Sequence, residues 1–347
     1  MIEVNIIIPV RKISTILINT IKNLEKQTFK NFIVTILVDR KHYINNFKLK
    51  KVKVIDLFGS KNMSFKRNYA AKKTKTKYLV FLDSDAYPEN KNWLKNGIKF
   101  LKKYEKQNVL ISGGPDLSPK NESLECKISG ILDKSYFISG FRNYRKNKEK
   151  SKFVKQLASC NMFISRLNYI SLGGMKESLY TGEDADLCNR VIINKKKIFY
   201  HPSISVIHLN RPFKAYLIQR IDRAHESARA TKDFLSRVIF NNKKGSYNSK
   251  SFRYEFLINP MLSIYLIAYM INYNFSFISI FITSFPLFLF LILTFLESTR
   301  LTKNIKYFLN IFIKLNITII VQSFANLYFL FFKDNFLKKK YTNQNDK

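Results

Sequence analysis

The first 240 residues alternate short apolar runs with segments that have helical spacing. The apolar runs are rich in β-branched and aromatic residues, so we expect buried strands. The expected strands are 4–10, 32–39, 53–57, 78–82 and 109–114. The expected helices are 14–27, 64–73 with Ser64 as its N-cap, and 91–104. This alternation predicts an α/β fold with a Rossmann-like, mostly parallel sheet covered on both faces.

The pattern changes near residue 255. From Phe256 to Phe295 the chain carries no Lys, Arg, Asp or Glu. At a helical rise of about 1.5 Å per residue, this run is too long for one membrane span and fits two. We therefore expect a hairpin of two transmembrane helices over 255–297, with its turn at Asn272-Tyr273-Asn274. Both flanks are basic, which predicts an inner or plasma membrane protein with a cytoplasmic catalytic domain.

A third apolar segment, 308–332, is interrupted by Lys314 and several amides. Its apolar residues recur at steps of three and four, which predicts one helical stripe. The stripe consists of Leu309, Ile313, Ile317, Ile320, Phe324, Leu327 and Phe331. A full span would put the basic Lys338-Lys339-Lys340 tail outside, so we favour a helix lying in the cytoplasmic interface over a third span.

These patterns predict five consecutive parts of the chain. They are a catalytic domain over 1–240, a basic linker over 241–254, the transmembrane hairpin over 255–297, an amphipathic interfacial or third transmembrane helix over 304–334, and a basic polar tail over 335–347.

The formal net charge is +36, from 60 Lys and Arg against 24 Asp and Glu. It is compatible with nucleic-acid binding, with attraction to an anionic membrane surface, or with a lysine-rich coding bias that needs no partner. Low-complexity basic arms and zinc-finger spacings are absent from the sequence. We therefore expect no nucleic-acid partner.

The cysteines, Cys126, Cys160 and Cys188, are odd in number, widely spaced and without a CxxC motif. This argues against a disulfide framework or a zinc site and fits a reducing compartment. The stretch MIEVNIIIPV reads directly as a strand. We therefore expect no secretory signal.

Three carboxylates follow expected strands. Asp39 ends the second strand, and Asp83 and Asp85 follow the strand at 78–82. Parallel sheets bind ligands at the carboxyl ends of their strands, and paired carboxylates suit Mg²⁺ or Mn²⁺ with a diphosphate. An acidic loop in which Asp83 only caps the next turn is the plainer alternative.

A second acidic cluster, Glu183, Asp184 and Asp186, follows a glycine and opens a helix that runs to about Asn194. Acids in a first helical turn are ordinary dipole stabilisers. One of them facing the metal site would instead accept a proton from a nucleophile. Spacing alone leaves both readings open.

In this order, the motifs resemble inverting glycosyltransferases of family 2, which have a GT-A fold. The stretches that carry the resemblance are VNIIIPV, FIVTILVD, SFKRNYAAKKTKTKYLVFLDSDAYP, SCNMFISR and GGMKESLYTGEDADLCNR. The resemblance implies a role for each matching residue. The residues that would contact the nucleotide sugar are Pro9, Val10, Asp39, Arg67, Asn68 and Ser84. The metal-binding DxD motif would consist of Asp83 and Asp85, with His208 as a further metal or phosphate contact. Asp184 would be the catalytic base, Arg190 would be structural, and the acceptor side would include Glu183, Glu177 and Asn161.

The chain departs from the family pattern at two strand ends. The first strand leads into Arg11-Lys12 where the family has an asparagine-glutamate pair, and Asp39 is followed by Arg40 rather than a second acid. The helix LIQRIDRAHESARA lacks the tryptophan of the QxxRW signature of processive synthases. The resemblance therefore implies transfer of a single sugar.

The implied donor is a UDP-, GDP- or dTDP-sugar with Mg²⁺ or Mn²⁺ as cofactor. The membrane segments favour a lipid-linked acceptor, although a soluble or protein acceptor with the hairpin as a mere anchor stays open. Two other functions compete. A sugar nucleotidyltransferase needs a glycine-rich, arginine-bearing loop after the first strand, where this chain reads PVRKIS. A membrane-anchored scaffold would not need Asp83 or Asp184.

Overall fold

The computed structural model describes residues 2–39, 51–59, 61–240, 255–271 and 277–332. The predicted linker at 241–254, the predicted turn at 272–274 and the predicted tail at 335–347 lie outside the described residues, as does Arg40.

The chain separates into two compact units. The first, which we call the sheet unit, contains Met1–Pro119 and Tyr144–Leu209. The second, the helical unit, contains Lys120–Asn143 and Asn210–Asp334. The helical unit therefore combines the apolar C-terminal helices with two parts of the predicted catalytic domain, its internal segment 120–143 and its last part, 210–240.

The sheet unit is built on an eight-stranded sheet with the order β3-β2-β1-β4-β9-β6-β10-β8. Four strand pairings are parallel, whereas β9 runs antiparallel between β4 and β6, and β8 is antiparallel to β10. The predicted mostly parallel α/β sheet is confirmed. The strands are β1 (Val4–Pro9), β2 (Phe32–Val38), β3 (Val52–Asp56), β4 (Tyr78–Phe81), β6 (Val109–Gly113), β8 (Lys152–Val154), β9 (Met162–Ser165) and β10 (Lys197–Tyr200).

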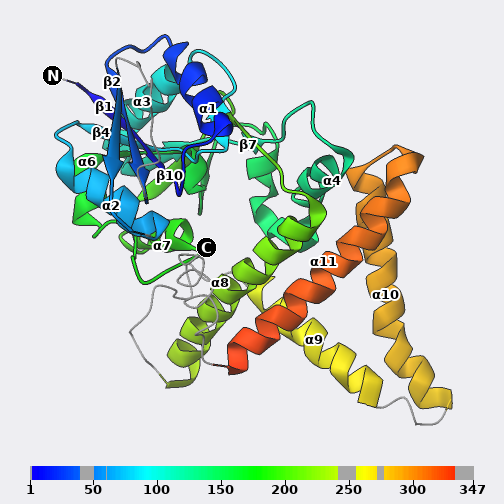
Figure 1. Cartoon of the computed structure of the whole chain (residues 1–347). Helices are drawn as coiled ribbons and strands as arrows, with labels where there is room; N and C mark the ends of the chain where they lie inside the picture. The colour runs from blue at the N-terminus through cyan, green and yellow to red at the C-terminus, as the bar shows by residue number, and fades with distance from the viewer. Residues whose placement is uncertain (1, 40–50, 60, 241–254, 272–276, 333–347) are drawn as a thin grey trace. The chain divides into compact units, whose positions relative to one another are not determined.

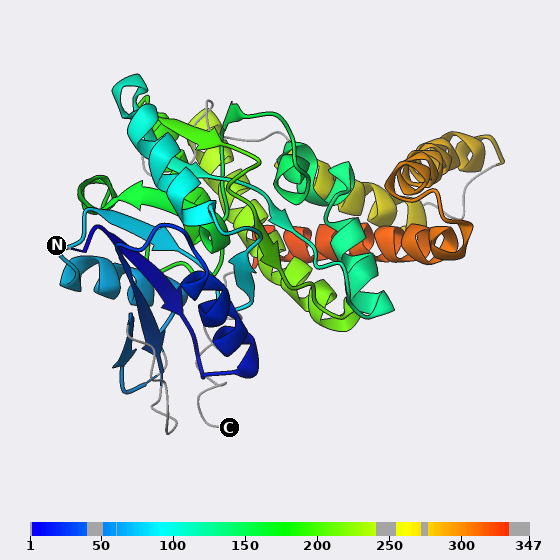
Figure 2. The same ribbon diagram turned by 90° about the horizontal axis from the view of Figure 1, so that it is seen from above.

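Helices cover both faces of this sheet, as Figures 1 and 2 show. Every residue of β1 is buried, which explains why its sequence is continuously apolar rather than alternating. The helices α1 (Thr15–Glu25) and α3 (Trp93–Lys103) share a core with one face. The helices α2 (Met63–Lys73), α6 (Arg166–Ser171) and α7 (Glu183–Ile193) share a second core with the other. Short 3₁₀ turns complete the unit: η1 (Glu105–Gln107), η2 (Gly140–Lys146) and η3 (Ser159–Asn161).

The N-terminus of α2 differs from its prediction. Asn62, not Ser64, is the N-cap, because the Asn62 side chain accepts a hydrogen bond from the backbone N–H of Phe65. Ser64 lies inside the helix and is buried. An asparagine caps at least as well as a serine, so the helix begins one residue earlier than predicted.

A second, three-stranded sheet has the order β5-β11-β7. Its strands are β5 (Ala86–Pro88), β7 (Asp116–Leu117) and β11 (Val206–His208). In the antiparallel pairing of β5 with β11, His208 lies opposite Ala86. This pairing brings a histidine from late in the unit next to the loop that carries Asp83 and Asp85.

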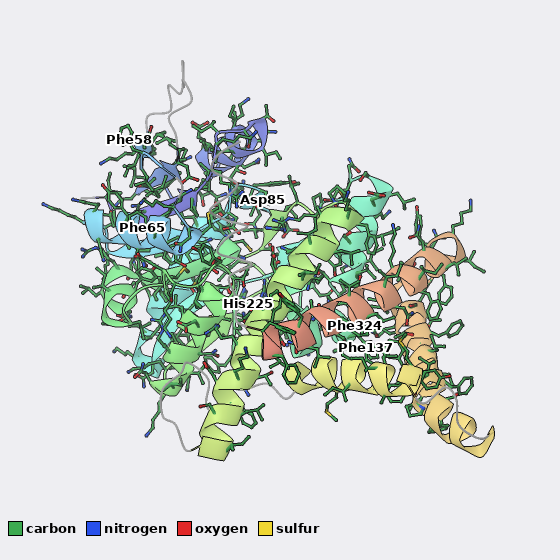
Figure 3. All side chains as sticks on the ribbon, turned by 60° about the horizontal axis from the view of Figure 1, so that its bottom comes forward. Phe58, Phe65, Asp85, Phe137, His225 and Phe324 are labelled. Carbon is green, nitrogen blue, oxygen red and sulfur yellow. The ribbon has the colours of Figure 1, made fainter. Side chains whose placement is uncertain are left out.

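The helical unit contains α4 (Leu124–Leu132), α5 (Tyr136–Ser139), α8 (Phe213–Phe240), α9 (Glu255–Ile271), α10 (Phe277–Leu301) and α11 (Ile305–Phe331). Figure 1 shows α11 running alongside α8, and Figure 3 labels His225 on α8, whose ring meets Phe329 of α11 edge-on. A buried ion pair of 2.5 Å joins Arg220 of α8 to Asp133 at the end of α4. The unit therefore ties the 120–143 segment to the C-terminal helices.

Two described helical stretches are long and apolar enough to cross a membrane: Ser284–Leu301 and Ile305–Phe331. The apolar part of α9, Met261–Met270, is shorter. The predicted hairpin over 255–297 thus contains one such stretch, and the second is α11, which we expected to lie in the interface.

The helix α11 presents its predicted apolar stripe outward. Within that stripe, Leu309 is 62% exposed and Phe331 75% exposed. The polar side chains of Thr318, Ser323 and Asn326 are instead fully buried. The buried face also contains large apolar side chains, Ile311, Leu315, Ile319 and Phe329, so it mixes polar and apolar residues. The exposed apolar stripe is compatible with contact with lipid.

We predict that Gly97→Ala destabilises the sheet unit by about 1–3 kcal/mol, because overpacking a filled core forces displacement. A Cβ at Gly97 would lie 2.2 Å from the Phe163 ring, which itself packs against Trp93. Trp93 is the chain's single tryptophan and buried, so the urea midpoint of its fluorescence in detergent reports on this core. The exposed Lys95→Ala on the same helix is the control. Equal midpoints for both variants would contradict the prediction.

Candidate active site

Arg67 of α2 is buried and joins two carboxylates that are distant in sequence. Its Nη2 donates to Asp83 Oδ1 and its Nη1 to Glu183 Oε1, each at 2.8 Å. Burial acts to lower the pKa of Arg67, but the charges of Asp83 and Glu183 outweigh burial and raise this pKa. The loop after β4 and the start of α7, two regions predicted to be functional, therefore meet at one side chain.

Glu183 and Asp184 open α7 in different environments. Burial raises the pKa of Glu183 to about 7, and the nearby charge of Asp184 contributes, even though Arg67 opposes the shift. The two oxygens of Asp184 accept hydrogen bonds from the backbone N–H groups of Ser159, at 3.2 Å, and Ala185, at 2.7 Å. Asp184 is thus held at the positive end of the helix dipole.

The third acid of this cluster has a structural environment. Asp186 is fully buried and pairs with Arg190 at 2.9 Å and with Lys176 at 3.4 Å. Arg190 also donates to the backbone carbonyls of Leu172 and Gly174. These contacts match the structural role expected for Arg190, and they make Asp186 its ion-pair partner.

The loop after β4 turns sharply between its two aspartates. The N–H of Ala86 donates to the carbonyl of Asp83 at 3.2 Å, and the carbonyl of Ser84 accepts from the Thr20 hydroxyl of α1. The Asp85 carbonyl accepts from the N–H of Leu209 at 3.0 Å. Helix α1 and strand β11 therefore fix this loop from two sides. Figure 3 labels Asp85 in the loop.

The predicted metal residues Asp83, Asp85 and His208 come together in the structure. His208 Nε2 lies 3.5 Å from Asp85 Oδ1. Carboxylate oxygens and an imidazole nitrogen form a donor set that suits Mn²⁺, and the carboxylates alone suit Mg²⁺. Cys160, which the sequence analysis did not single out, joins the cluster: donor atoms of Asp83, Cys160 and His208 lie within 4.8 Å of one another.

The predicted nucleotide residues at the ends of β1 and β2 are linked by a lysine. Lys66 of α2 is fully buried, its Nζ lies 2.8 Å from Asp39 Oδ1, and it also donates to the carbonyl of Val10, which directly follows Pro9. Burial lowers the pKa of Lys66, an effect that Asp39 opposes. Asp39 also accepts from the N–H of Lys61. Lys66 precedes Arg67 in the motif, which was the only sequence signal for it.

Asn68 connects α2 to the loop before α7. Its amide donates to the carbonyl of Met175 and to Glu177 Oε1, each at 2.8 Å, and accepts from the N–H of Met175. Gly174 has a φ of +67°, and a Cβ there would lie 2.5 Å from Asn68 Oδ1. The loop therefore needs glycine for both conformation and space. The donor-side role of Asn68 and the acceptor-side role of Glu177 stay predictions.

Asn161 is buried at the meeting point of several segments. Its Oδ1 accepts from the Trp93 indole at 2.9 Å, and its Nδ2 donates to the carbonyls of Pro115 and Ile204. These hydrogen bonds engage both the oxygen and the nitrogen of the Asn161 amide, and they link α3 to the segments that contain Pro115 and Ile204. The predicted acceptor-side role of Asn161 stays a prediction.

A buried ion-pair cluster beside Asp184 was not foreseen from the sequence. Asp116 of β7 lies 2.6 Å from Lys146 Nζ and 3.5 Å from Arg145 Nε. Burial alone would raise the pKa of Asp116, but these cations outweigh it and lower this pKa. The charges of Asp116 and Asp184 both raise the pKa of Arg145. In the sequence, Arg145 and Lys146 blend into the general excess of lysine and arginine.

Comparisons with known proteins agree with this geometry. Residues 5–166 match the family model described as Glycosyl transferase family 2. The mannosyltransferase PcManGT from Pyrobaculum calidifontis, solved with GDP-Man and Mn²⁺, aligns with a TM-score of 0.62 at 13% identity, covering 94% of this chain and 87% of that chain.

A structure of GalNAc-T7 with UDP, GalNAc and Mn²⁺ aligns with a TM-score of 0.47 at 14% identity, covering 74% of this chain and 54% of that chain. A search of curated protein sequences gives no match.

The family match covers β1 through β9, including Arg67 and the loop with Asp83 and Asp85, and the PcManGT alignment extends the shared fold over nearly the whole chain. The two long apolar helices at the C-terminal end fit a membrane anchor. Residues 5–166 therefore form a domain that matches the glycosyltransferase family 2 model, in a chain with a GT-A-like fold and C-terminal apolar helices.

Proposed function

We propose that the protein is an inverting, metal-dependent glycosyltransferase. It moves one sugar from a nucleotide-sugar donor to a hydroxyl or phosphate of a lipid-linked acceptor, at the cytoplasmic face of the membrane, in glycan or polysaccharide biosynthesis. The observation that carries this proposal is the Arg67 bridge, which sets the Glu183-Asp184 pair beside the Asp83 loop.

Asp83, Asp85 and His208 are the residues that would hold Mg²⁺ or Mn²⁺. The bound ion would neutralise charge on the departing nucleoside diphosphate. Asp39, Pro9 and Val10 would contact the nucleotide at the ends of β1 and β2, in the crevice where open sheets bind such ligands. Lys66 would keep Asp39 oriented toward that crevice, since it occupies one of the two Asp39 oxygens.

Asp184 would accept the proton of the acceptor hydroxyl as that oxygen attacks the anomeric carbon. Attack from the side opposite the leaving nucleotide inverts the configuration of that carbon. Two backbone N–H groups hold Asp184, so its position does not depend on a flexible side-chain partner. Glu183 is engaged by Arg67 and would position rather than take the proton.

Two observations support an anionic, lipid-linked acceptor. Arg145 carries a positive charge close enough to Asp184 for the two charges to interact, and Lys146 adjoins it. A phosphate group entering this side would meet both cations, which are good phosphate partners. The outward apolar stripe of α11 and the apolar surface of α10 suit contact with lipid.

The basic turn between α10 and α11 supports the proposed orientation. Lys303 lies in this turn, and Arg300 and Lys306 lie in the adjoining ends of α10 and α11. Arg300 donates to the carbonyl of Lys134, and Glu297 accepts from the N–H of Tyr136, so this turn is held against the segment inserted between β7 and β8. Basic residues at this turn are the charge pattern of a cytoplasmic connection between membrane helices, which supports the proposed orientation.

We expect the detergent-solubilised protein to bind one of GDP, UDP or dTDP in a metal-dependent way. With Mn²⁺ present, Asp85→Asn should lower nucleotide affinity by about 10- to 100-fold, since metal-site changes have effects of this order. Isothermal titration with and without Mn²⁺ measures this. The exposed Glu105→Gln is the control, with unchanged affinity. Absence of binding by all three nucleotides would overturn the proposal and favour a scaffold.

A transfer assay tests the role of Asp184. Each radiolabelled nucleotide sugar is offered to a polyprenyl phosphate in micelles and, separately, to soluble sugar acceptors. Asp184→Asn should lower kcat by about 10²- to 10⁴-fold, the usual contribution of a general base, while nucleotide affinity is kept. Glu105→Gln again serves as the control. A variant with normal kcat would exclude Asp184 as the base, and transfer only to soluble acceptors would exclude the lipid-linked acceptor.

The raised pKa of Glu183 predicts a pH-dependent stability. The folded protein binds this proton more tightly than the unfolded chain, because the pKa rises from 4.5 to about 7 on folding. The resulting stabilisation is full below about pH 4.5 and is lost as the pH rises through about 7. The urea midpoint of Trp93 fluorescence should therefore fall more steeply over this window in the wild type than in Glu183→Gln. Parallel pH profiles for the two proteins would contradict the raised pKa.

A further inference from the structure

Cys160 points its thiol into the proposed metal site. The side chain is only 4% exposed, and Sγ lies within 4.8 Å of donor atoms of both Asp83 and His208. Cys160 is a buried free cysteine, so its thiol is not held in a disulfide. A buried thiol directed at a carboxylate and an imidazole is a set of three metal donors.

The sheet register explains why these residues meet. Strand β9 pairs antiparallel with β4, and its first residue, Met162, lies opposite Phe81. Cys160 lies two residues before Met162 of β9, and Asp83 lies two residues after Phe81 of β4. The pairing of β11 with β5 brings in His208 from the side. Three separate segments therefore deliver the donors. His208 ends β11, whereas Asp83 and Cys160 lie just beyond the paired ends of β4 and β9.

We propose that Cys160 is a ligand of this metal site together with Asp83 and His208, so that the site prefers borderline or soft ions such as Co²⁺, Zn²⁺ and Cd²⁺ over Mg²⁺. On binding, the Cys160 S–H loses its proton to solvent, and the sulfur then coordinates the ion. The inference rests on the proposed metal dependence of the enzyme and specifies which ions its site selects.

The donor distances are compatible with a single ion. Nitrogen, oxygen and sulfur ligands lie about 2.0–2.3 Å from Zn²⁺, so two donors on one ion are at most roughly twice that distance apart. The observed 4.8 Å limit is close to this, and small side-chain rotations close the difference. Arg67 occupies Oδ1 of Asp83, which leaves the other oxygen of the carboxylate for the ion.

The plainer role for Cys160 is that of a small core side chain. It packs with the apolar residues of the core that includes Val80 and Ala158, and buried cysteines often behave as small hydrophobes. Burial also raises the pKa of its thiol, so without a metal the group is neutral. The two roles differ in one respect: only a ligand places sulfur on the bound ion.

Titration of the full-length protein with Co²⁺ separates the two roles. Cobalt bound to a thiolate shows a near-ultraviolet charge-transfer absorption, which oxygen and nitrogen ligands alone do not produce. We expect this band in the wild type and its loss in Cys160→Ser, with Co²⁺ affinity lowered at least about tenfold. Mg²⁺ affinity, measured by competition, should hardly change in Cys160→Ala, since Mg²⁺ takes oxygen ligands.

The other cysteines provide matched controls. The double variant Cys126→Ser with Cys188→Ser keeps Cys160 as the only thiol and should retain the band. This variant also serves if Cys160→Ser fails to fold, as judged by Trp93 fluorescence. Bound Co²⁺ without a thiolate band, or a band that persists in folded Cys160→Ser, would overturn the inference while leaving the proposed transferase intact. Absence of any Co²⁺ binding would also overturn it, whereas the transferase itself is judged by Mn²⁺-dependent nucleotide binding.

Discussion

The site depends on the ion pairs that the buried guanidinium of Arg67 makes. The guanidinium lies between Asp83 and Glu183 at 2.8 Å from each, and the positive charge lets both carboxylates be withdrawn from water together. Removing it would leave two acids partly buried without a partner, a loss that is strongly destabilising. Because one carboxylate belongs to the loop after β4 and the other to the start of α7, the same contact sets the distance between the two chemical halves of the site.

Two strand pairings bring the other proposed metal ligands to the Asp83 loop. The antiparallel insertion of β9 between β4 and β6 carries Cys160 to the Asp83 loop, and the small sheet carries His208 to the same place. Backbone pairing is rigid, so the donors do not have to be ordered when a ligand binds. The proposed metal site is therefore pre-formed by the sheet, while the side of Asp184 is held by backbone N–H groups and lined by Arg145.

The helical unit differs from the sheet unit in which side chains it buries and which it exposes. In the sheet unit, apolar side chains fill the two cores on either side of the strands. The buried face of α11 instead mixes Thr318, Ser323 and Asn326 with large apolar residues, while its predicted stripe is exposed and apolar. This exposed stripe and the two long apolar stretches agree with a C-terminal membrane anchor.

The sequence by itself determined the five strands β1, β2, β3, β4 and β6, the helices α1, α2 and α3 to within a few residues, and the two acidic clusters. Burial of a parallel sheet requires continuous apolar runs, and a strand end leaves polar residues where ligands bind. The order of the sequence motifs also predicted the family whose model matches residues 5–166. The sequence did not reveal Lys66, Arg145 or Cys160, since a buried lysine, a paired arginine and a lone thiol have no periodic signature. Only the tertiary structure decided these positions, because strand order and register bring together residues that the chain keeps far apart.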